Sequence, residues 1–258
     1  MFRDVYVNAG LPATYRLRVE AAALILPADA VVTGRSAAHL WGAELCDPDD
    51  PVEVMARRRF GPVRGLRIRT GSLGDDERVV RFGVPVCSAL HATWELARDL
   101  PLHEAVPWID ALGHGRALSR RAIVAHADRH QNEYGHRRAT SALERCDPRA
   151  ESPPESTLRL HLADAGLPVP VPQYRIFVGG EFLARVDLAW PDIRMAIEYD
   201  GQWHSDPNQL GRDRARLRAL NEAGWYVYHV TRDDLRDPAV LTRDLARVAT
   251  ARREGRLA

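Results

Sequence analysis

The chain has 258 residues, of which 45% are hydrophobic and 28% are charged. This balance is typical of a globular protein with enough apolar mass for two domains, and no stretch reaches the roughly 18 apolar residues of a membrane helix. The net charge of +1 does not by itself indicate a nucleic-acid-binding protein.

Two residue types restrict the chemistry. The chain contains no lysine, so all 36 basic residues are arginine, which binds phosphate in a bidentate manner but does not serve as a base. The cysteines Cys46, Cys87 and Cys146 are too scattered for a disulfide framework or a zinc knuckle. The N-terminal residues lack the apolar stretch of a signal peptide, so we expect a cytoplasmic protein without a membrane partner.

The first domain is expected over residues 1–148. Helical patterns cover six segments: residues 15–26, 36–41, 88–99, 102–112, 119–129 and 135–145. Strand patterns cover residues 51–56 and 66–70. The sequence therefore predicts a mainly helical α+β domain. The proline-containing segment 145–154 then interrupts two helical patterns, and we place the domain boundary there, at about residue 148.

The second domain, residues 149–258, has clearer patterns. A capping box of Ser152 and Glu155 begins a helix over residues 155–165. Three strands follow over residues 173–178, 182–190 and 194–200, joined by turns at residues 179–180 and 191–192. The remaining elements are a helix at 207–223, a strand at 225–230 and a helix at 238–253. This order predicts an α/β fold with a mixed sheet flanked by helices.

Three carboxylates lie in the second and third of these strands. If the hairpin turns at residues 191–194, Asp187 and Glu198 fall nearly opposite each other, and Asp200 shares the face of Glu198. Like charges on one face are destabilising unless a cation lies between them or their pKa values rise. The acids are therefore candidate ligands of Mg²⁺, or of Mn²⁺, an ion that would polarise a phosphate and supply hydroxide.

A structural interpretation competes with this one, since the acids would also be explained by ion pairs with Arg185 and Arg194. Further along, the predicted helix carries four arginines that cannot all share a face at 3.6 residues per turn. Of these, Arg212 and Arg216 are our candidates for phosphate contacts, which would make binding salt-sensitive.

Two segments resemble a known family. Residues 182–191 (Phe-Leu-Ala-Arg-Val-Asp-Leu-Ala-Trp-Pro) and 196–204 (Ala-Ile-Glu-Tyr-Asp-Gly-Gln-Trp-His) are similar to the very-short-patch-repair-like branch of the PD-(D/E)XK nuclease superfamily. The downstream pattern Asp213-Arg-x-Arg-x-x-x-Leu-x-x-x-Gly-Trp also fits. The resemblance covers residues 150–255 and implies a restriction-endonuclease-like α/β sandwich with metal-dependent DNA endonuclease activity.

The resemblance assigns roles to individual residues. Asp187 matches the metal-binding aspartate, Glu198 matches the first acid of the E-x-K motif, and Glu155 matches the acid on the preceding helix. The capping box offers a second explanation for Glu155. The motif lysine is replaced by Asp200, and we expect His204 to activate water or protonate the leaving oxygen. A loop histidine that caps the next helix or is solvated explains His204 equally well.

The first domain resembles, less specifically, abortive-infection type IV antitoxins. The similar residues are 5–7 (Val-Tyr-Val), 33–38 (Thr-Gly-Arg-Ser-Ala-Ala) and 88–97, and a complete helix-turn-helix is not expected before them. The function expected is a DNA endonuclease in repair or phage defence. The alternative is an idle DNA-binding or antitoxin-like regulator that keeps the nuclease fold. DNA is the expected partner, with a homodimer, or a toxin or other protein bound by the first domain, as further expectations.

Overall fold

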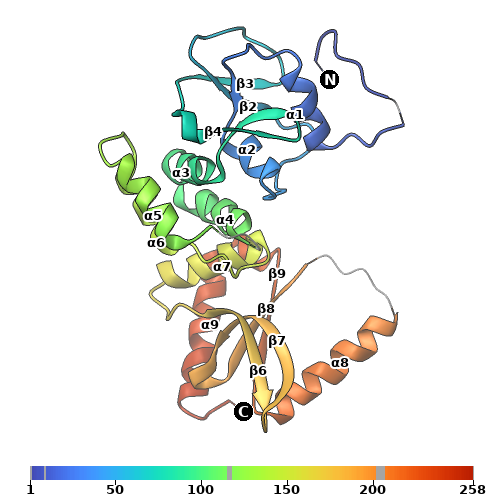
Figure 1. Ribbon diagram of the computed structural model, residues 1–258. Coiled ribbons are helices and arrows are strands. Elements are labelled where there is room, and N and C mark those ends of the chain that lie inside the picture. The colour runs from blue at the N-terminus through green and yellow to red at the C-terminus, as the bar shows by residue number, and fades with distance from the viewer. Residues whose placement is uncertain (1, 9, 115–117, 202–206, 258) are drawn as a thin grey trace. The chain divides into compact units, whose positions relative to one another are not determined.

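A computed structural model of the chain describes residues 2–8, 10–114, 118–201 and 207–257 (Figure 1). It divides into two compact units, Met1–Pro148 and Arg149–Ala258. Both units combine helices with a mixed sheet, so the α/β character expected of the chain is confirmed.

A five-stranded sheet forms one part of the first unit, with strands in the order β3-β2-β1-β5-β4. The bounds are β1 Val31–Val32, β2 Val52–Ala56, β3 Leu66–Thr70, β4 Arg78–Arg81 and β5 Val84–Cys87. β1 is antiparallel to β2 and parallel to β5, so the sheet is mixed. Apolar side chains of α1 (Tyr15–Ala23), α2 (Gly34–Leu40) and the strands form one core.

Four further helices complete the first unit: α3 Ala89–Asp99, α4 Leu102–Gly113, α5 Arg120–Arg129 and α6 His136–Arg145. α3 is central to the group because it contacts α2, α4, α5 and α6. Its start is set by Ser88, whose hydroxyl oxygen accepts the His91 N–H at 3.2 Å. The short 3-10 helix η1 (Asp75–Glu77) precedes β4 and brings Glu77 towards α3.

The strands of the first unit are where the sequence prediction falls short. The predicted strands 51–56 and 66–70 are present as β2 and β3, but β1, β4 and β5 were missed. β1 has only two residues and β5 contains Pro85, so neither shows the alternating pattern from which a strand is predicted. The helix expected over residues 15–26 ends at Ala23, before Pro27.

The second unit contains a four-stranded sheet in the order β6-β7-β8-β9. Its elements are α7 Pro153–Asp164, β6 Val171–Val178, β7 Glu181–Trp190, β8 Met195–Asp200, α8 Pro207–Glu222, β9 Tyr226–Thr231 and α9 Pro238–Arg253. β6, β7 and β8 form an antiparallel meander and β9 joins β8 in parallel. The 3-10 helices η2 (Pro191–Ile193) and η3 (Asp234–Arg236) lie in the connections. The order of elements agrees with the sequence prediction.

Two apolar cores lie on the two faces of this sheet. Leu158 and Leu162 of α7 and Leu241 and Leu245 of α9 pack in one core, which includes Ile197 of β8. Residues of β6 and β7 pack with Leu220 of α8 in the other. Helices therefore cover both faces of the sheet, as Figure 1 shows. Among the described helices of the whole chain, none is long and apolar enough to cross a membrane.

Candidate active site

The candidate site lies where β7 and β8 separate. These strands pair only between Leu188–Trp190 and Met195–Ile197, with Leu188 opposite Ile197. The next opposed position in this register is held by Asp187 and Glu198, as the sequence predicted. There the Asp187 carboxylate accepts the backbone N–H of Tyr199 at 2.9 Å. An acidic side chain thus replaces a main-chain acceptor at the point where the ladder opens.

Asp187 is in an environment that disfavours its charge. Burial and, to a lesser extent, the nearby carboxylates of Glu155 and Glu198 raise the pKa of its carboxyl to about 6. The Tyr199 N–H and the Arg216 guanidinium act in the opposite direction. Three carboxyl groups from a helix and two strands therefore influence one another, which is the electrostatic condition that a bound cation would relieve.

Glu198 is paired with an arginine of α8. The Nη1 of Arg216 donates to Glu198 Oε2 at 3.0 Å, and its Nη2 donates to Oε1. Nη2 also donates to the carbonyl oxygen of Arg185 at 2.9 Å. Glu198 is largely buried, with 13% of its side chain exposed, whereas Arg216 is 36% exposed. The guanidinium therefore supplies a counter-charge from the solvent side.

Arg185 and Arg194, which were expected to pair with the acids of the strands, make other contacts. Arg185 makes two hydrogen bonds of 2.8 Å to Glu151. Arg194 ends η2 in the left-handed conformation, with its guanidinium beside Gly224. Glu198 is therefore paired with an arginine, as the structural interpretation expected. The arginine is Arg216, and not Arg185 or Arg194.

Glu155 makes the capping interactions predicted for it, and its carboxylate also influences the pKa of Asp187. Its carboxylate accepts the Ser152 hydroxyl at 2.7 Å and the Glu151 N–H at 3.1 Å, which completes the start of α7. It also accepts a hydrogen bond of 2.8 Å from the side-chain amide of Gln173. Gln173 has φ of 51° and lies across from Asp187 in the register of β6 and β7. This strained residue connects the helix cap to the acids of the sheet.

Asp200 lies two residues beyond Glu198 on β8, and its partner is a histidine. His229 Nδ1 and Asp200 Oδ1 are 3.1 Å apart, and both side chains are partly exposed. His229 is in register with Glu198 on the neighbouring strand β9. The sequence analysis missed this histidine, because only the parallel pairing of β8 and β9 places it beside the acids.

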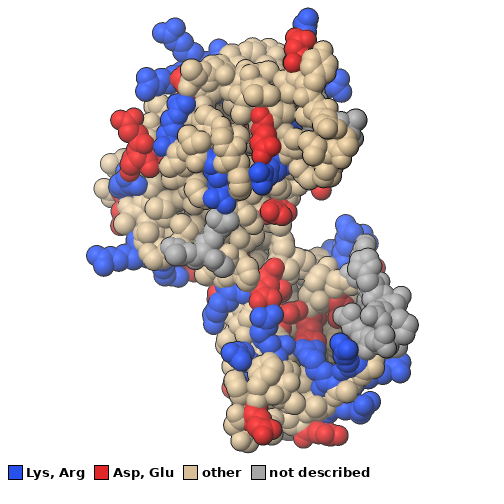
Figure 2. All heavy atoms as spheres, turned by 45° about the vertical axis from the view of Figure 1, so that its right-hand side comes forward, with Lys and Arg blue, Asp and Glu red and all other residues tan. Residues whose placement is uncertain are grey.

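The remaining candidates are placed as follows. Arg212 is exposed on α8, one turn before Arg216. His204 lies outside the described residues. On the face of the second unit shown in Figure 2, acidic side chains lie among arginines. The arrangement as a whole offers oxygen ligands, a counter-charge and an imidazole, which is a set suited to metal-assisted phosphate chemistry.

Comparisons with known proteins give no activity for the chain. No family model and no solved structure matches it. It is similar to uncharacterized protein Rv2248 of Mycobacterium tuberculosis (strain H37Rv) and to uncharacterized protein MT2308 of the same species (strain CDC 1551), each 37% identical over 155 residues. The match covers 59% of this chain and 57% of each relative.

Proposed function

We propose that the second unit is a metal-dependent DNA endonuclease with a restriction-endonuclease-like fold. One observation carries the proposal: Asp187 accepts the Tyr199 N–H where β7 and β8 separate, opposite Glu198 in the register, and burial together with the carboxylates of Glu155 and Glu198 raises its pKa to about 6. The resemblance of residues 150–255 to the nuclease superfamily supports the same function. Residues with this combination of burial and charge neighbours are frequent at functional sites.

The donor set fits a hard divalent cation. Asp187 and Glu198 would hold Mg²⁺, or Mn²⁺, and Asp200 is the third candidate ligand. When bound, the ion would polarise the scissile phosphate and make a water more acidic. Such a cation would also replace Arg216 as the counter-charge of Glu198. Arg216, and Arg212 one turn away, would then be free to contact DNA phosphates.

Proton transfer must use a side chain other than lysine, because the chain contains none. The Asp200 carboxylate holds the Nδ1 side of His229, so the other ring nitrogen is available to accept or donate a proton. His229 therefore joins His204 as a candidate acid or base. The two are distinguished by replacing each with glutamine and comparing the pH dependence of cleavage.

The direct test is cleavage of supercoiled plasmid DNA by the full chain with Mg²⁺ or Mn²⁺. Asp187→Asn keeps the acceptor for the Tyr199 N–H but removes the charge, so we expect activity to fall at least about 100-fold. Asp192→Asn, an exposed position in η2 of the same hairpin, is the matched control and should cleave normally. Undiminished cleavage by Asp187→Asn would contradict the assignment.

A second candidate function is DNA binding without turnover. It is favoured by the Arg216–Glu198 pair, which already neutralises one of the metal ligands, and by Asp200 at the position of the motif lysine. This candidate predicts salt-sensitive binding of duplex DNA with no metal-dependent product. The plasmid assay separates the two functions, because only the nuclease yields nicked or linear DNA.

A further inference from the structure

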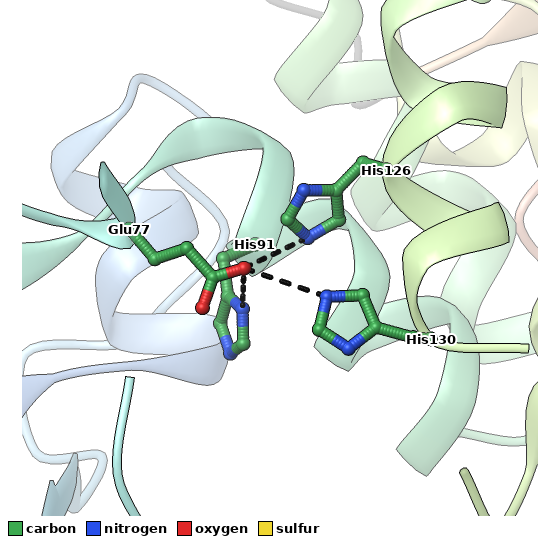
Figure 3. A group of neighbouring side chains, drawn as sticks. All are labelled: Glu77, His91, His126 and His130. Atoms are coloured by element: carbon green, nitrogen blue, oxygen red, sulfur yellow. Dashed lines mark ion pairs between the residues drawn. The ribbon is translucent and has the colours of Figure 1, made fainter. Parts of the chain in front are cut away.

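A second group of side chains that could bind a metal lies within the first unit. Glu77 comes from η1, His91 from α3, and His126 and His130 from α5 and its C-terminal cap. Figure 3 shows the three rings directed at one oxygen of the glutamate. One ligand atom from each of the four residues lies within 4.8 Å of the others.

The group is largely buried, and several of its ring nitrogens have no hydrogen-bond partner among the described residues. The exposed fractions of Glu77, His91 and His126 are 7%, 6% and 2%. Within the described part of the chain, both ring nitrogens of His91 and the Nε2 atoms of His126 and His130 lack a hydrogen-bond partner. Buried polar atoms without partners are rare because their lost hydration is not replaced. Three of them, His91 Nδ1, His126 Nε2 and His130 Nε2, surround one oxygen of Glu77, which is the arrangement expected of ligands around a bound ion.

Hydrogen bonding to Glu77 does not account for the arrangement. Its Oε1 lies 3.4 Å from His91 Nδ1, 3.4 Å from His130 Nε2 and 3.6 Å from His126 Nε2. These distances exceed those of N–H···O hydrogen bonds, and three donors would compete for one oxygen. They agree instead with the edge of a tetrahedron of ligands about 2.1 Å from a central ion, which is about 3.4 Å.

The residues around the group resemble the outer ligand shell of a metal site. His130 Nδ1 is 2.7 Å from Glu133 Oε1, and His91 Nε2 faces Glu95 Oε1 at 3.7 Å. Glu95 is itself fixed by the Gly34 N–H at 2.9 Å. A carboxylate behind a metal-bound imidazole orients the ring and strengthens its donor nitrogen.

His126 requires one rearrangement. Its Nδ1 accepts a hydrogen bond of 2.7 Å from Arg129, so the ring proton is on Nε2, the side that faces Glu77. Metal binding at Nε2 transfers this proton to Nδ1 and displaces the guanidinium. Arg129 is half exposed and already pairs with Asp76 at 2.9 Å, which allows it to turn away. Burial, reinforced by His130, lowers the pKa of His126 to about 4, so the ring is neutral at pH 7.

We propose that Glu77, His91, His126 and His130 bind a zinc-class transition-metal ion in a closed structural site. Three imidazoles and one carboxylate form a donor set preferred by Zn²⁺ over Mg²⁺. Because all four positions of a tetrahedron are occupied by protein, the ion would join η1, α3 and α5 and would not activate water.

The test is metal binding by the full chain after chelator treatment, measured by calorimetry and by metal analysis. We expect one Zn²⁺ per chain at this site and no competition from Mg²⁺. His126→Gln and His130→Gln should each weaken Zn²⁺ binding by at least about 100-fold, a loss larger than those of outer-shell substitutions. His114→Gln, at an exposed position in the same unit, should bind Zn²⁺ as the wild type does.

The visible spectrum of bound Co²⁺, recorded for the wild type and for Asp187→Asn, tests the coordination geometry directly. Co²⁺ bound to the wild type should give the intense visible spectrum of tetrahedral coordination, a result that needs no variant to fold. Asp187→Asn should retain this spectrum, because the acids of the second unit are not involved. Absence of tight Zn²⁺ binding and of a tetrahedral Co²⁺ spectrum in the folded wild type, or normal binding by folded His126→Gln and His130→Gln, would overturn the proposal.

Discussion

Each of the two units contains a cluster of ionisable side chains, and the two clusters differ in charge and in the type of ligand atom. The second unit brings together Glu155, Asp187 and Glu198, and the excess negative charge is met by Arg216 and by a raised pKa of Asp187. In the first unit, three imidazoles surround a single carboxylate, and several of their buried ring nitrogens lack a hydrogen-bond partner in the part of the chain that the structure describes. The chemical type of the ligands, and not the number of acids, decides which cation a site prefers.

Construction differs as well as charge. The acids of the second unit lie at a strand opening, beside the partly exposed side chains of Arg216 and His229. In the first unit, His91 and His126 are almost fully buried and 14% of the His130 side chain is exposed. An open site with oxygen ligands suits catalysis by Mg²⁺, whereas a closed site with nitrogen ligands suits a structural Zn²⁺.

The largest expected effect is a crossover in metal binding. Asp187→Asn should weaken Mg²⁺ binding to the full chain by about 100-fold and leave Zn²⁺ binding unchanged, whereas His126→Gln should do the reverse. Calorimetric titrations of both ions into both variants measure this. If one substitution impaired both ions equally, the two clusters would not be separate sites.

The next effect concerns the counter-charge of the acids. Arg216→Gln leaves Glu198 largely buried without its cation, so the free energy of unfolding should fall by about 1–3 kcal/mol in the absence of metal. Added Mg²⁺ should restore most of the loss by taking the place of the guanidinium. Urea unfolding with and without Mg²⁺ measures both quantities.

The matched control for Arg216→Gln is Arg212→Gln, because Arg212 is exposed one turn earlier on α8. Its effect should stay within about 0.5 kcal/mol. A loss that Mg²⁺ fails to restore would mean that Arg216 is a purely structural partner of Glu198.

A smaller effect follows from the pKa of Asp187. Because this pKa is raised to about 6 in the folded state, the folded state holds the proton more tightly than the unfolded state. The stabilising contribution of Asp187 is therefore fully present below about pH 4, the pKa of an unfolded aspartate, and is lost as the pH rises through 6. Asp187→Asn should remove this decrease and stabilise the protein by about 1–2 kcal/mol at pH 8, allowing for partial exposure, but not at pH 4. Equal effects of the substitution at pH 4 and pH 8 in urea unfolding would refute the raised pKa.

The smallest effect is expected for Glu155→Gln. Glutamine completes a capping box as well as glutamate does, so the free energy of unfolding should change by less than about 1 kcal/mol. Urea unfolding measures this change. The loss of charge should still lower the pKa of Asp187 and reduce cleavage. A normal cleavage rate would assign Glu155 to the helix cap alone.

Sequence patterns were informative where the interactions are local. The capping box of Ser152 and Glu155 and the turn at residues 191–194 are set by residues close in the chain, and they fixed the start of α7 and the opposition of Asp187 and Glu198. His126 and His130 are spaced by four residues, a helical spacing typical of metal ligands, so the sequence contains a signal for two of the four residues of this cluster.

The order of elements in the second unit, and the strand face that carries its acids, could therefore be predicted from the sequence, because hydrophobic periodicity and turn chemistry act over a few residues. The pairing of Arg216 with Glu198, the position of His229 beside Asp200, and the cluster of Glu77, His91, His126 and His130 are visible only in the folded chain. Those contacts join residues 14 to 53 positions apart. Such contacts depend on strand order and helix packing, which no local pattern encodes.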